Sequence, residues 1–543
     1  MRRHLLHTTL PIFTLALAGC TGSTLDLYAP DWQRIAVERG DRDPIQQSSI
    51  PTPTAGQPVE DLDINADGIL SLSLEQTVLT ALSRNRDLQV AQLTPVETGA
   101  FELIERGSFD PEIFAEASIG KEESIEVARS TGDQFPVDAE TSSIEAGISA
   151  STPTGTELEL AVTQDRDISN RSPEQQTARA GLTITQSLLR GLRPSVNLAA
   201  VRQAELETDA SLYELRGFVE ALVAETETAY WRYALAKRRI DIFERSLEVA
   251  RKQSNEIDQR IEFGDLAPAE AAAARSEVAL REQGLIDARA SLEAERLRLL
   301  RLVDAPLSVQ DVLTTGLEDI SQDLPPDLDD TSSRVELALK ARPELNEARL
   351  RLEQNRLETI RTRDGLLPRL ELFATLGKTG YDDTFAGSFD ELDGDTYDFT
   401  LGIRFAQALG RTEARGRDTL ALASRDKAAL AVSNLEQLVE LEVLLADNEV
   451  RRARDQIRAS RTTRQLQEQT AQAEEERFRV GASTTLLVAQ AQRDLLDAQI
   501  AEVEAIIAFR LALIQAHLAE GTLLERRQIT LDSASGTQSF QEH

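Results

Sequence analysis

The sequence predicts a mixed α and β fold in which long antiparallel helical hairpins are combined with groups of strands. An apolar seam runs from Tyr233 to Ile261 in alternating steps of three and four residues, which is the repeat of a coiled coil. Other segments alternate strictly between apolar and polar residues, as half-exposed strands do. An internal repeat gives each half of the chain a helix, an extended part and a long hairpin.

The first hairpin spans residues 195–304. Ser195 is a candidate N-cap, and a helix over 196–261 would be about 100 Å long. Gly264 then interrupts the pattern. Asp265 is the candidate cap of a second helix, which tolerates a proline in its first turn. We therefore expect a long antiparallel hairpin with its tip at Gly264.

This hairpin and the helix before it occur twice. Residues 262–304 match residues 479–521 at a constant offset of 217, and residues 81–88 match residues 338–345 at an offset of 257. The two offsets differ by 40, so the first copy carries an insertion. Most of that insertion lies within residues 120–191.

Composition argues against several classes of function. The 543 residues carry a net charge of −33, which disfavours nucleic acid as a partner. The only cysteine is Cys20, so neither an internal disulfide nor a cysteine-ligated metal is expected. The histidines are too few and too scattered for a metal or catalytic cluster, and no nucleophile–base pair is evident, so we expect no enzyme and no cofactor. The four histidines are His4, His7, His517 and His543.

The N-terminus has the features of a bacterial lipoprotein. Residues 1–19 combine a basic start with a short apolar core, as a signal peptide does. The segment LAGC ending at Cys20 resembles a lipobox, which predicts acylation of Cys20. Residues 20–72 are then expected to be a lipidated tether. Residues 63–75 imitate a calcium-binding loop, but Leu74 occupies the position that needs an acid, so we expect a capped turn there.

The alternating segments predict four strands, or six if the turn at 153–155 adds a hairpin to the sheet. The alternating segments are residues 113–119, 144–150, 158–162 and 182–184 in the first copy of the repeat, and residues 367–373 and 397–405 in the second. Seven aromatic residues gather in the second copy's strands and the loop between them, which suits a membrane-interface girdle, although a soluble sheet core is an alternative.

A sheet this small cannot close on itself. Open edges are not tolerated in a bilayer, so the chain must oligomerise, and three chains of four strands would give a twelve-stranded barrel. The hairpins of the three chains would then form a helical barrel beneath it.

Four segments carry a resemblance to a known family. They are QSLLRG (186–191), AYW (229–231), FGDL (263–266) and FRVGAST (478–484). In this order and spacing, within the doubled architecture, they resemble the TolC-type outer-membrane factors, which are exit ducts of tripartite efflux pumps and type I secretion systems. The resemblance implies a homotrimer with a β-barrel in the outer membrane of a Gram-negative bacterium and an α-barrel in the periplasm. It also implies a periplasmic adaptor protein and an inner-membrane pump or ABC exporter as partners.

The family's functional positions carry over to the hairpin tips, where members meet the adaptor. The matching residues here are Phe263, Gly264, Asp265, Val480, Gly481, Ala482 and Ser483. Some members narrow the entrance with two aspartates just past the second tip. Leu487 and Gln490 stand at those positions, and Glu270 near the first tip is the nearest acidic candidate.

The expected domains follow from these boundaries. After the tether come a first repeat (73–306), a linker (307–332), a second repeat (333–525) and a disordered tail (526–543). An alternative function is a coiled-coil envelope lipoprotein that acts as a spacer or scaffold without a channel.

Overall fold

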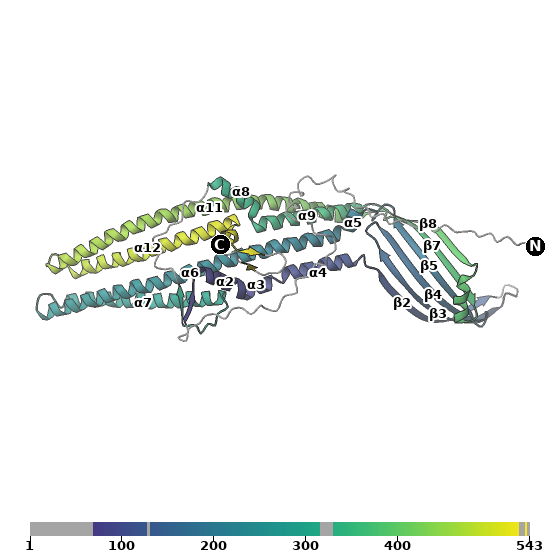
Figure 1. Cartoon of the computed structure of the whole chain (residues 1–543), viewed down its shortest axis with the longest axis horizontal. Coiled ribbons are helices and arrows are strands. Elements are labelled where there is room, and N and C mark those ends of the chain that lie inside the picture. The colour runs from purple at the N-terminus through teal and green to yellow at the C-terminus, as the bar shows by residue number, and fades with distance from the viewer. Residues whose placement is uncertain (1–68, 128–130, 315–329, 532–537, 540–543) are drawn as a thin grey trace, which may run out of the picture. The chain divides into compact units, whose positions relative to one another are not determined.

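The computed structural model describes residues 69–127, 131–314, 330–531 and 538–539 (Figure 1). Two helical hairpins and one six-stranded sheet are the main elements within these ranges, which confirms the predicted mixed α and β fold. None of the helices in the described ranges has the length and apolar character needed to cross a membrane.

Each hairpin consists of two long helices. The first pairs α6 (Ala199–Glu262) with α7 (Ala269–Leu302), and the second pairs α11 (Thr412–Arg479) with α12 (Thr485–Glu520). The predicted seam of α6 faces inward, which confirms the coiled-coil interpretation. Its buried members are Tyr233, Ala236, Leu247, Ala250, Ser254 and Ile257.

The start of α7 differs from the prediction. Its N-cap position is Pro268, and no side chain caps the helix. Asp265 instead takes part in the turn through its backbone N–H, which donates to the Arg260 carbonyl oxygen at 2.8 Å. The prediction of an Asp265 cap was therefore wrong, because the turn that closes α6 uses this residue before α7 begins.

Shorter helices precede the strands in both halves of the chain. They are α2 (Leu74–Arg84), α3 (Arg86–Ala91) and α4 (Thr94–Gly107) in the first half, and α8 (Thr331–Ala341) and α9 (Pro343–Asp364) in the second. Ser73 caps α2 in a capping box, accepting from the Gln76 N–H at 3.1 Å and donating its own N–H to the Gln76 side chain at 2.9 Å. A capped turn was expected here, and Leu74 is the first residue of the helix.

Six strands form one antiparallel sheet in the order β2-β3-β4-β5-β7-β8. They are β2 (Glu112–Val127), β3 (Gln134–Ser151), β4 (Thr156–Ser169), β5 (Gln175–Ser187), β7 (Arg369–Asp382) and β8 (Tyr397–Ala406). The turn between β3 and β4 contains Gly155 at φ +73° and is closed by the Thr152 N–H, which donates to the Thr156 carbonyl at 2.9 Å. Of the two strand counts that the sequence left open, the structure has six.

The helices join the sheet at one end of the strands. The chain enters the sheet from α4 into β2 and from α9 into β7 (Figure 1). It returns to the helices from β5 into α5 (Pro194–Asn197) and from β8 into α11. The junctions are fixed to one another, because the Gly191 N–H donates to the Asp364 carboxylate at 2.8 Å. The opposite ends of the strands are joined by loops, one of which holds α10 (Phe385–Asp390) and a 3-10 turn (Glu391–Asp393).

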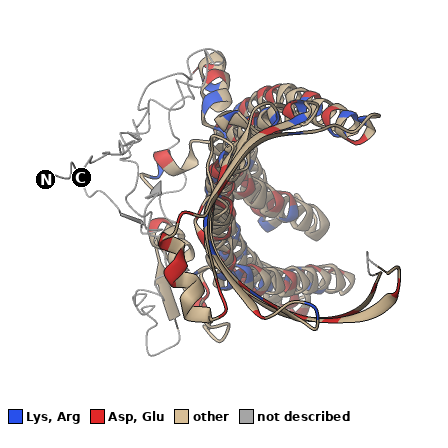
Figure 2. Cartoon of the chain, turned by 90° about the vertical axis from the view of Figure 1, so that its right-hand side faces the viewer, with Lys and Arg blue, Asp and Glu red and all other residues tan. Residues whose placement is uncertain are grey.

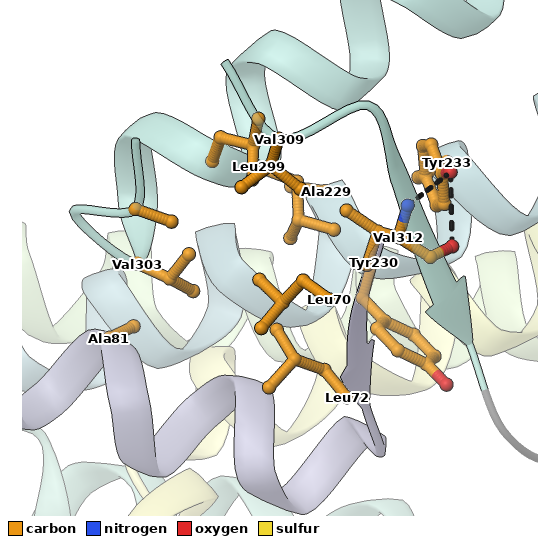
Figure 3. Packing of buried hydrophobic residues seen from close by; sticks show 12 residues of the cluster. Leu70, Leu72, Ala81, Ala229, Tyr230, Tyr233, Leu299, Val303, Val309 and Val312 are labelled. Atoms are coloured by element: carbon orange, nitrogen blue, oxygen red, sulfur yellow. Dashed lines mark hydrogen bonds between the residues drawn. The ribbon is translucent and has the colours of Figure 1, made fainter. Parts of the chain in front are cut away.

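A small parallel sheet covers the first hairpin where its helices meet α2. It pairs β1 (Ile69–Leu72) with β6 (Asp311–Thr314), and Leu70 and Val312 are completely buried beside Tyr230 (Figure 3). The Tyr233 hydroxyl lies 3.1 Å from the Val312 carbonyl oxygen, to which it donates. Residues expected to lie in the tether and in the linker therefore belong to the core.

The helical core also extends past the expected end of the second repeat. Short helix α13 (Leu523–Arg526) is followed by Arg527, whose guanidinium donates two hydrogen bonds to Glu227 at 2.5 and 2.6 Å. Ile529 is 5% exposed within a core cluster. Arg527 and Ile529 thus contact the helical core within the segment that was expected to be a disordered tail, although residues 526–528 are exposed. Beyond them, β9 (Thr530–Leu531) pairs with β10 (Gln538–Ser539).

Candidate functional site

The tip of the first hairpin is a tight turn closed by two backbone hydrogen bonds. Gly264 has a φ of +82°, and its N–H donates to the Ile261 carbonyl at 3.0 Å. The Asp265 N–H donates to the Arg260 carbonyl at 2.8 Å. This pair of bonds is a Schellman motif, in which the left-handed position favours glycine.

The second tip repeats this geometry. Gly481 has a φ of +78° and donates to the Phe478 carbonyl at 3.0 Å, and Ala482 donates to the Arg477 carbonyl at 2.7 Å. The Ser483 hydroxyl donates to the Glu474 carboxylate at 2.7 Å, and this bond holds the pKa of Glu474 below its ordinary value. The two matching sequences therefore fold into two matching turns.

Both tips offer apolar side chains beside bare backbone. Phe263 is 82% exposed and Val480 is 78% exposed. A Cβ atom added at Gly264 or at Gly481 would meet no other atom within 4 Å. The turns are thus open to a partner, and the only local restriction on them is the positive φ.

The two tips of one chain lie together. A buried cluster near the tips takes one residue from each of the four helices, namely Ile257 (α6), Ala274 (α7), Phe478 (α11) and Val488 (α12). The Arg260 guanidinium lies 5.0 Å from the centre of the Phe478 ring and adds a contact between the hairpins. Figure 1 shows the two tips at the same end of the helices.

A buried ionic group also connects the hairpins. Glu277 on α7 accepts a hydrogen bond from Arg493 on α12 at 2.7 Å, and the Arg281 guanidinium lies 2.6 Å from the same carboxylate. Burial lowers the pKa of Arg281, although Glu277 opposes the shift, and the neighbouring charge of Arg493 adds to it. One carboxylate thus joins two cations from different hairpins.

The predicted entrance positions lie close to the tips but carry little charge. Glu270 is half-buried in the first turn of α7, whereas Leu487 and Gln490 are exposed on α12. Seven residues further along α12, Asp494 and Asp497 repeat that spacing with exposed carboxylates. Sequence reasoning missed this pair, although its separation of three residues was visible.

The sheet has one apolar face. Six residues, one from each strand, form a continuous row across the sheet, and each residue is the cross-strand pairing partner of the next. All six side chains are large and apolar, and they are between 37% and 80% exposed. This apolar row consists of Ile113, Ile148, Leu160, Leu182, Leu376 and Phe399. Such an exposed continuous surface is uncommon on a protein surrounded by water.

The other face of the sheet is polar. Each residue of the apolar row has a neighbour along its own strand whose side chain points to the opposite face. These six neighbours also pair with one another across the sheet and form a second row. This polar row consists of Glu112, Ser149, Glu159, Thr183, Thr375 and Thr400. On the same face, Arg179 on β5 makes two hydrogen bonds to Asp398 on β8, at 2.9 and 3.1 Å. The two faces therefore suit two different solvents.

Cys20 and residues 63–68 lie outside the described ranges. Within those ranges, no group of three or more histidine, cysteine, aspartate or glutamate side chains is placed to hold a metal ion.

Comparison with known proteins adds to this geometry. Residues 78–304 and 335–516 match the family model described as outer membrane efflux protein. A search of curated protein sequences found no match.

Several solved structures are similar. The CmeC outer membrane channel of Campylobacter jejuni has a TM-score of 0.60 at 18% identity, over 83% of this chain and 86% of CmeC. The MtrE outer membrane channel of Neisseria gonorrhoeae has a TM-score of 0.61 at 18% identity, over 83% of this chain and 89% of MtrE. The outer membrane protein VceC of Vibrio cholerae has a TM-score of 0.59 at 19% identity, over 82% of this chain and 96% of VceC. The fold is therefore shared along most of each chain.

Proposed function

The chain belongs to the outer membrane efflux protein family, and from this membership we propose that three copies form an exit duct in the outer membrane. The duct receives cargo from an inner-membrane pump through a periplasmic adaptor, in a tripartite efflux pump or a type I secretion system. It conducts passively, and no catalytic step or cofactor is assigned to it.

The observation that carries this proposal is the sheet with one apolar and one polar face. Strands β2 and β8 are its edges, and neither has a second pairing partner among the described strands. Backbone groups in lipid must be hydrogen-bonded, so an open edge is costly there. Neighbouring copies satisfy both edges if they close the sheet into a barrel, with the polar face toward the lumen.

The paired tips support docking to the adaptor. Phe263 and Val480 leave apolar surface at the end of each hairpin. The residues proposed to touch the adaptor are Phe263, Gly264, Asp265, Val480, Gly481, Ala482 and Ser483. A trimer presents six such turns, two from each chain.

The proposed domain organisation follows the two matched segments. Residues 78–304 and 335–516 fall within the two repeats expected from the sequence, 73–306 and 333–525. A signal peptide over residues 1–19 and acylation of Cys20 remain part of the proposal, and they would tie the duct to the outer membrane by lipid as well as by the barrel.

Changing Cys20 to Ser should abolish acylation and weaken membrane attachment, because one of two anchors is lost. Mass spectrometry of the mature N-terminus measures the modification directly. An unmodified Cys20 in the wild-type chain would remove the lipoprotein claim without affecting the channel.

Export by the producing bacterium tests the function. Deleting the gene should raise the accumulation of at least one pump substrate from a panel of dyes and drugs or block secretion of a protein, and the wild-type chain should restore export. The purified chain should also produce discrete current steps in a planar bilayer. Unchanged export together with an absence of current would favour the spacer or scaffold instead.

A further inference from the structure

The first repeat contributes a strand hairpin that the second repeat lacks. In the second repeat, β7 leads directly to its partner β8, whereas in the first repeat β3 and β4 lie between β2 and β5. We propose that this β3–β4 hairpin is part of the membrane barrel wall, so that a three-chain barrel has eighteen strands. The inference rests on the proposed trimeric channel and adds the size of its outer-membrane pore.

The hairpin is inserted within the sheet rather than added at its margin. All 16 residues of β2 pair with β3, and β4 pairs with β5 from Thr156 to Asp167. Strand β2 therefore does not pair with β5, and no barrel that keeps this ladder can omit β3 and β4. Each copy of the chain then contributes six strands to the circumference.

The surface of the hairpin is suited to lipid. Ile148 on β3 and Leu160 on β4 continue the apolar row from β2 to β5 without interruption, and they are 45% and 54% exposed. Their neighbours Ser149 and Glu159 belong to the polar row on the other face. This alternation is the pattern of a transmembrane barrel strand. The occupant of the apolar face is therefore the acyl region of a bilayer.

The strands are also long enough to span a bilayer. A tilted transmembrane strand needs about 9–11 residues. β3 has 18 residues and β4 has 14, and the shortest strand of the sheet, β8, has 10. The inserted hairpin thus spans the membrane as fully as the strands around it.

Glycines on the polar face leave room for neighbouring aromatic rings, which permits the sheet to curve toward that face. Phe114 on β2 lies over its partner Gly147 on β3, where an added Cβ would come within 2.6 Å of the ring. Phe373 on β7 covers Gly402 on β8 in the same manner. Glycine kinks introduce curvature into a sheet, and aromatic rings over glycines help to fix its register. Viewed from its end, the sheet follows an arc (Figure 2).

The edges of the sheet allow identical copies to close a ring. Strand β2 runs away from the helices and β8 runs back toward them, so β8 of one copy would be antiparallel to β2 of the next. Strands about 4.8 Å apart with a tilt of about 40° give a barrel diameter of about 36 Å for eighteen strands, against about 24 Å for twelve. Barrels of this size leave an aqueous channel. The outer-membrane part of the duct is then a wide pore that accepts bulky hydrated cargo.

Fluorescence quenching in lipid vesicles tests the position of the hairpin. Leu160→Cys, on the apolar face of β4, is labelled with a thiol-reactive fluorophore and exposed to lipids with brominated acyl chains. Leu401→Cys on β8 is the reference for a lipid-facing site outside the hairpin. Glu159→Cys and Thr400→Cys are matched controls on the polar face, and the unmodified chain controls for labelling at Cys20.

We expect brominated lipid to reduce the fluorescence at Leu160→Cys as strongly as at Leu401→Cys, and to have little effect at the two polar-face controls. Quenching at Leu401→Cys without quenching at Leu160→Cys would overturn the eighteen-stranded barrel and leave the channel intact. Absence of quenching at both sites would contradict the membrane barrel itself. The failure of this inference is thus distinguishable from failure of the proposed function.

Disulfide cross-linking between copies gives an independent measurement. Ile403→Cys on β8 is combined with Ala115→Cys, Ala117→Cys or Ile119→Cys on β2, or with Leu160→Cys on β4. The proposal expects cross-linked copies only with the β2 positions. Cross-links through β4, or none at any position in an intact trimer, would contradict it.

Discussion

At the level of single residues, two buried carboxylates in the helical part of the chain have pKa values that are shifted in opposite directions. Glu220 is 1% exposed, and burial raises its pKa to about 7 despite the nearby Arg216. Burial also opposes ionisation of Glu520, but the nearby His517 ring, 3.6 Å from the carboxylate, and a hydrogen bond from Arg334 outweigh it and lower its pKa to about 2. The number of cationic and donor groups around each carboxylate decides the difference.

Glu220→Gln should change how stability depends on pH. The folded chain retains the proton on Glu220 to about pH 7, whereas the unfolded chain releases it near 4.5. The stability gained from this proton is full below pH 4.5 and is lost as pH rises through 7. At pH 8 we therefore expect the free energy of unfolding of the variant to exceed that of wild type by up to about 3 kcal/mol. Its melting temperature at this pH should be correspondingly higher.

Melting of the detergent-solubilised protein at pH 5 and pH 8 measures this effect. Glu225→Gln, an exposed position on the same helix, controls for the loss of one negative charge. An equal pH response in wild type and Glu220→Gln would show that Glu220 is already ionised in the folded chain.

Arg334→Met should strongly destabilise the helical region. Arg334 is 1% exposed and binds both Glu520 on α12 and Asp447 on α11, the latter at 2.8 Å. Removing one partner from a buried ion pair leaves charge without compensation and costs about 3–5 kcal/mol. The measurement is the melting temperature, with Arg452→Met at an exposed pair as the control. Equal melting of the two variants would mean that the buried network adds nothing.

At the level of elements, periodic patterns were predictable and irregular junctions were not. The spacing of Tyr233, Ala236 and the apolar residues after them identified α6, because residues on one face of a helix recur at steps of three and four along its whole length. The alternation around Ile144 and Leu158 identified β3 and β4 for the same reason. Their presence in the sheet was left open, since periodicity does not report which strands pair.

The parallel pair β1–β6 was missed. Each strand has only four residues, too few for a clear alternation, and they are separated by more than 200 residues. Their burial depends on tertiary packing with Tyr230 and Tyr233. The Asp265 cap failed for a related reason, because a turn residue has two possible roles and only the backbone geometry selects one. Partly buried ion pairs such as Glu277 with Arg493 likewise join positions that are remote in sequence.

The double variant Gly264→Val with Gly481→Val should separate assembly from docking. A β-branched residue at a positive φ adds strain of roughly 1–2 kcal/mol at each turn, which long hairpins can tolerate. Trimers should therefore form at near-normal abundance, while export falls sharply because the docking surface changes at all six tips. Trimer abundance on a gel and dye efflux are measured in parallel.

Gly416→Val is the matched control for the tip variant. A Cβ at Gly416 also meets nothing within 4 Å, but this residue lies within α11, away from both tips. It should leave both assembly and export unchanged. Normal export by the tip variant would show that the tips are not the docking surface, and loss of its trimers would show that the glycines are needed for folding.

At the level of the whole molecule, the sheet is incomplete in one chain. Both of its edges are open among the described strands, and one face carries the continuous apolar row. In the proposed trimer, association of identical copies would close the edges, and lipid would cover the row. The helical tips at the other end of the fold would then come together in one ring, so that membrane insertion and docking would depend on the same assembly.

Electron cryo-microscopy of the full chain in lipid nanodiscs tests this central claim most directly, because it counts chains and strands in one image reconstruction. The account predicts three chains around one axis and a single closed barrel of eighteen strands, with β8 of each chain beside β2 of the next and the apolar row against lipid. A monomer with a closed sheet, a twelve-stranded barrel with β3 and β4 outside it, or an assembly with the apolar row in contact with water would contradict it.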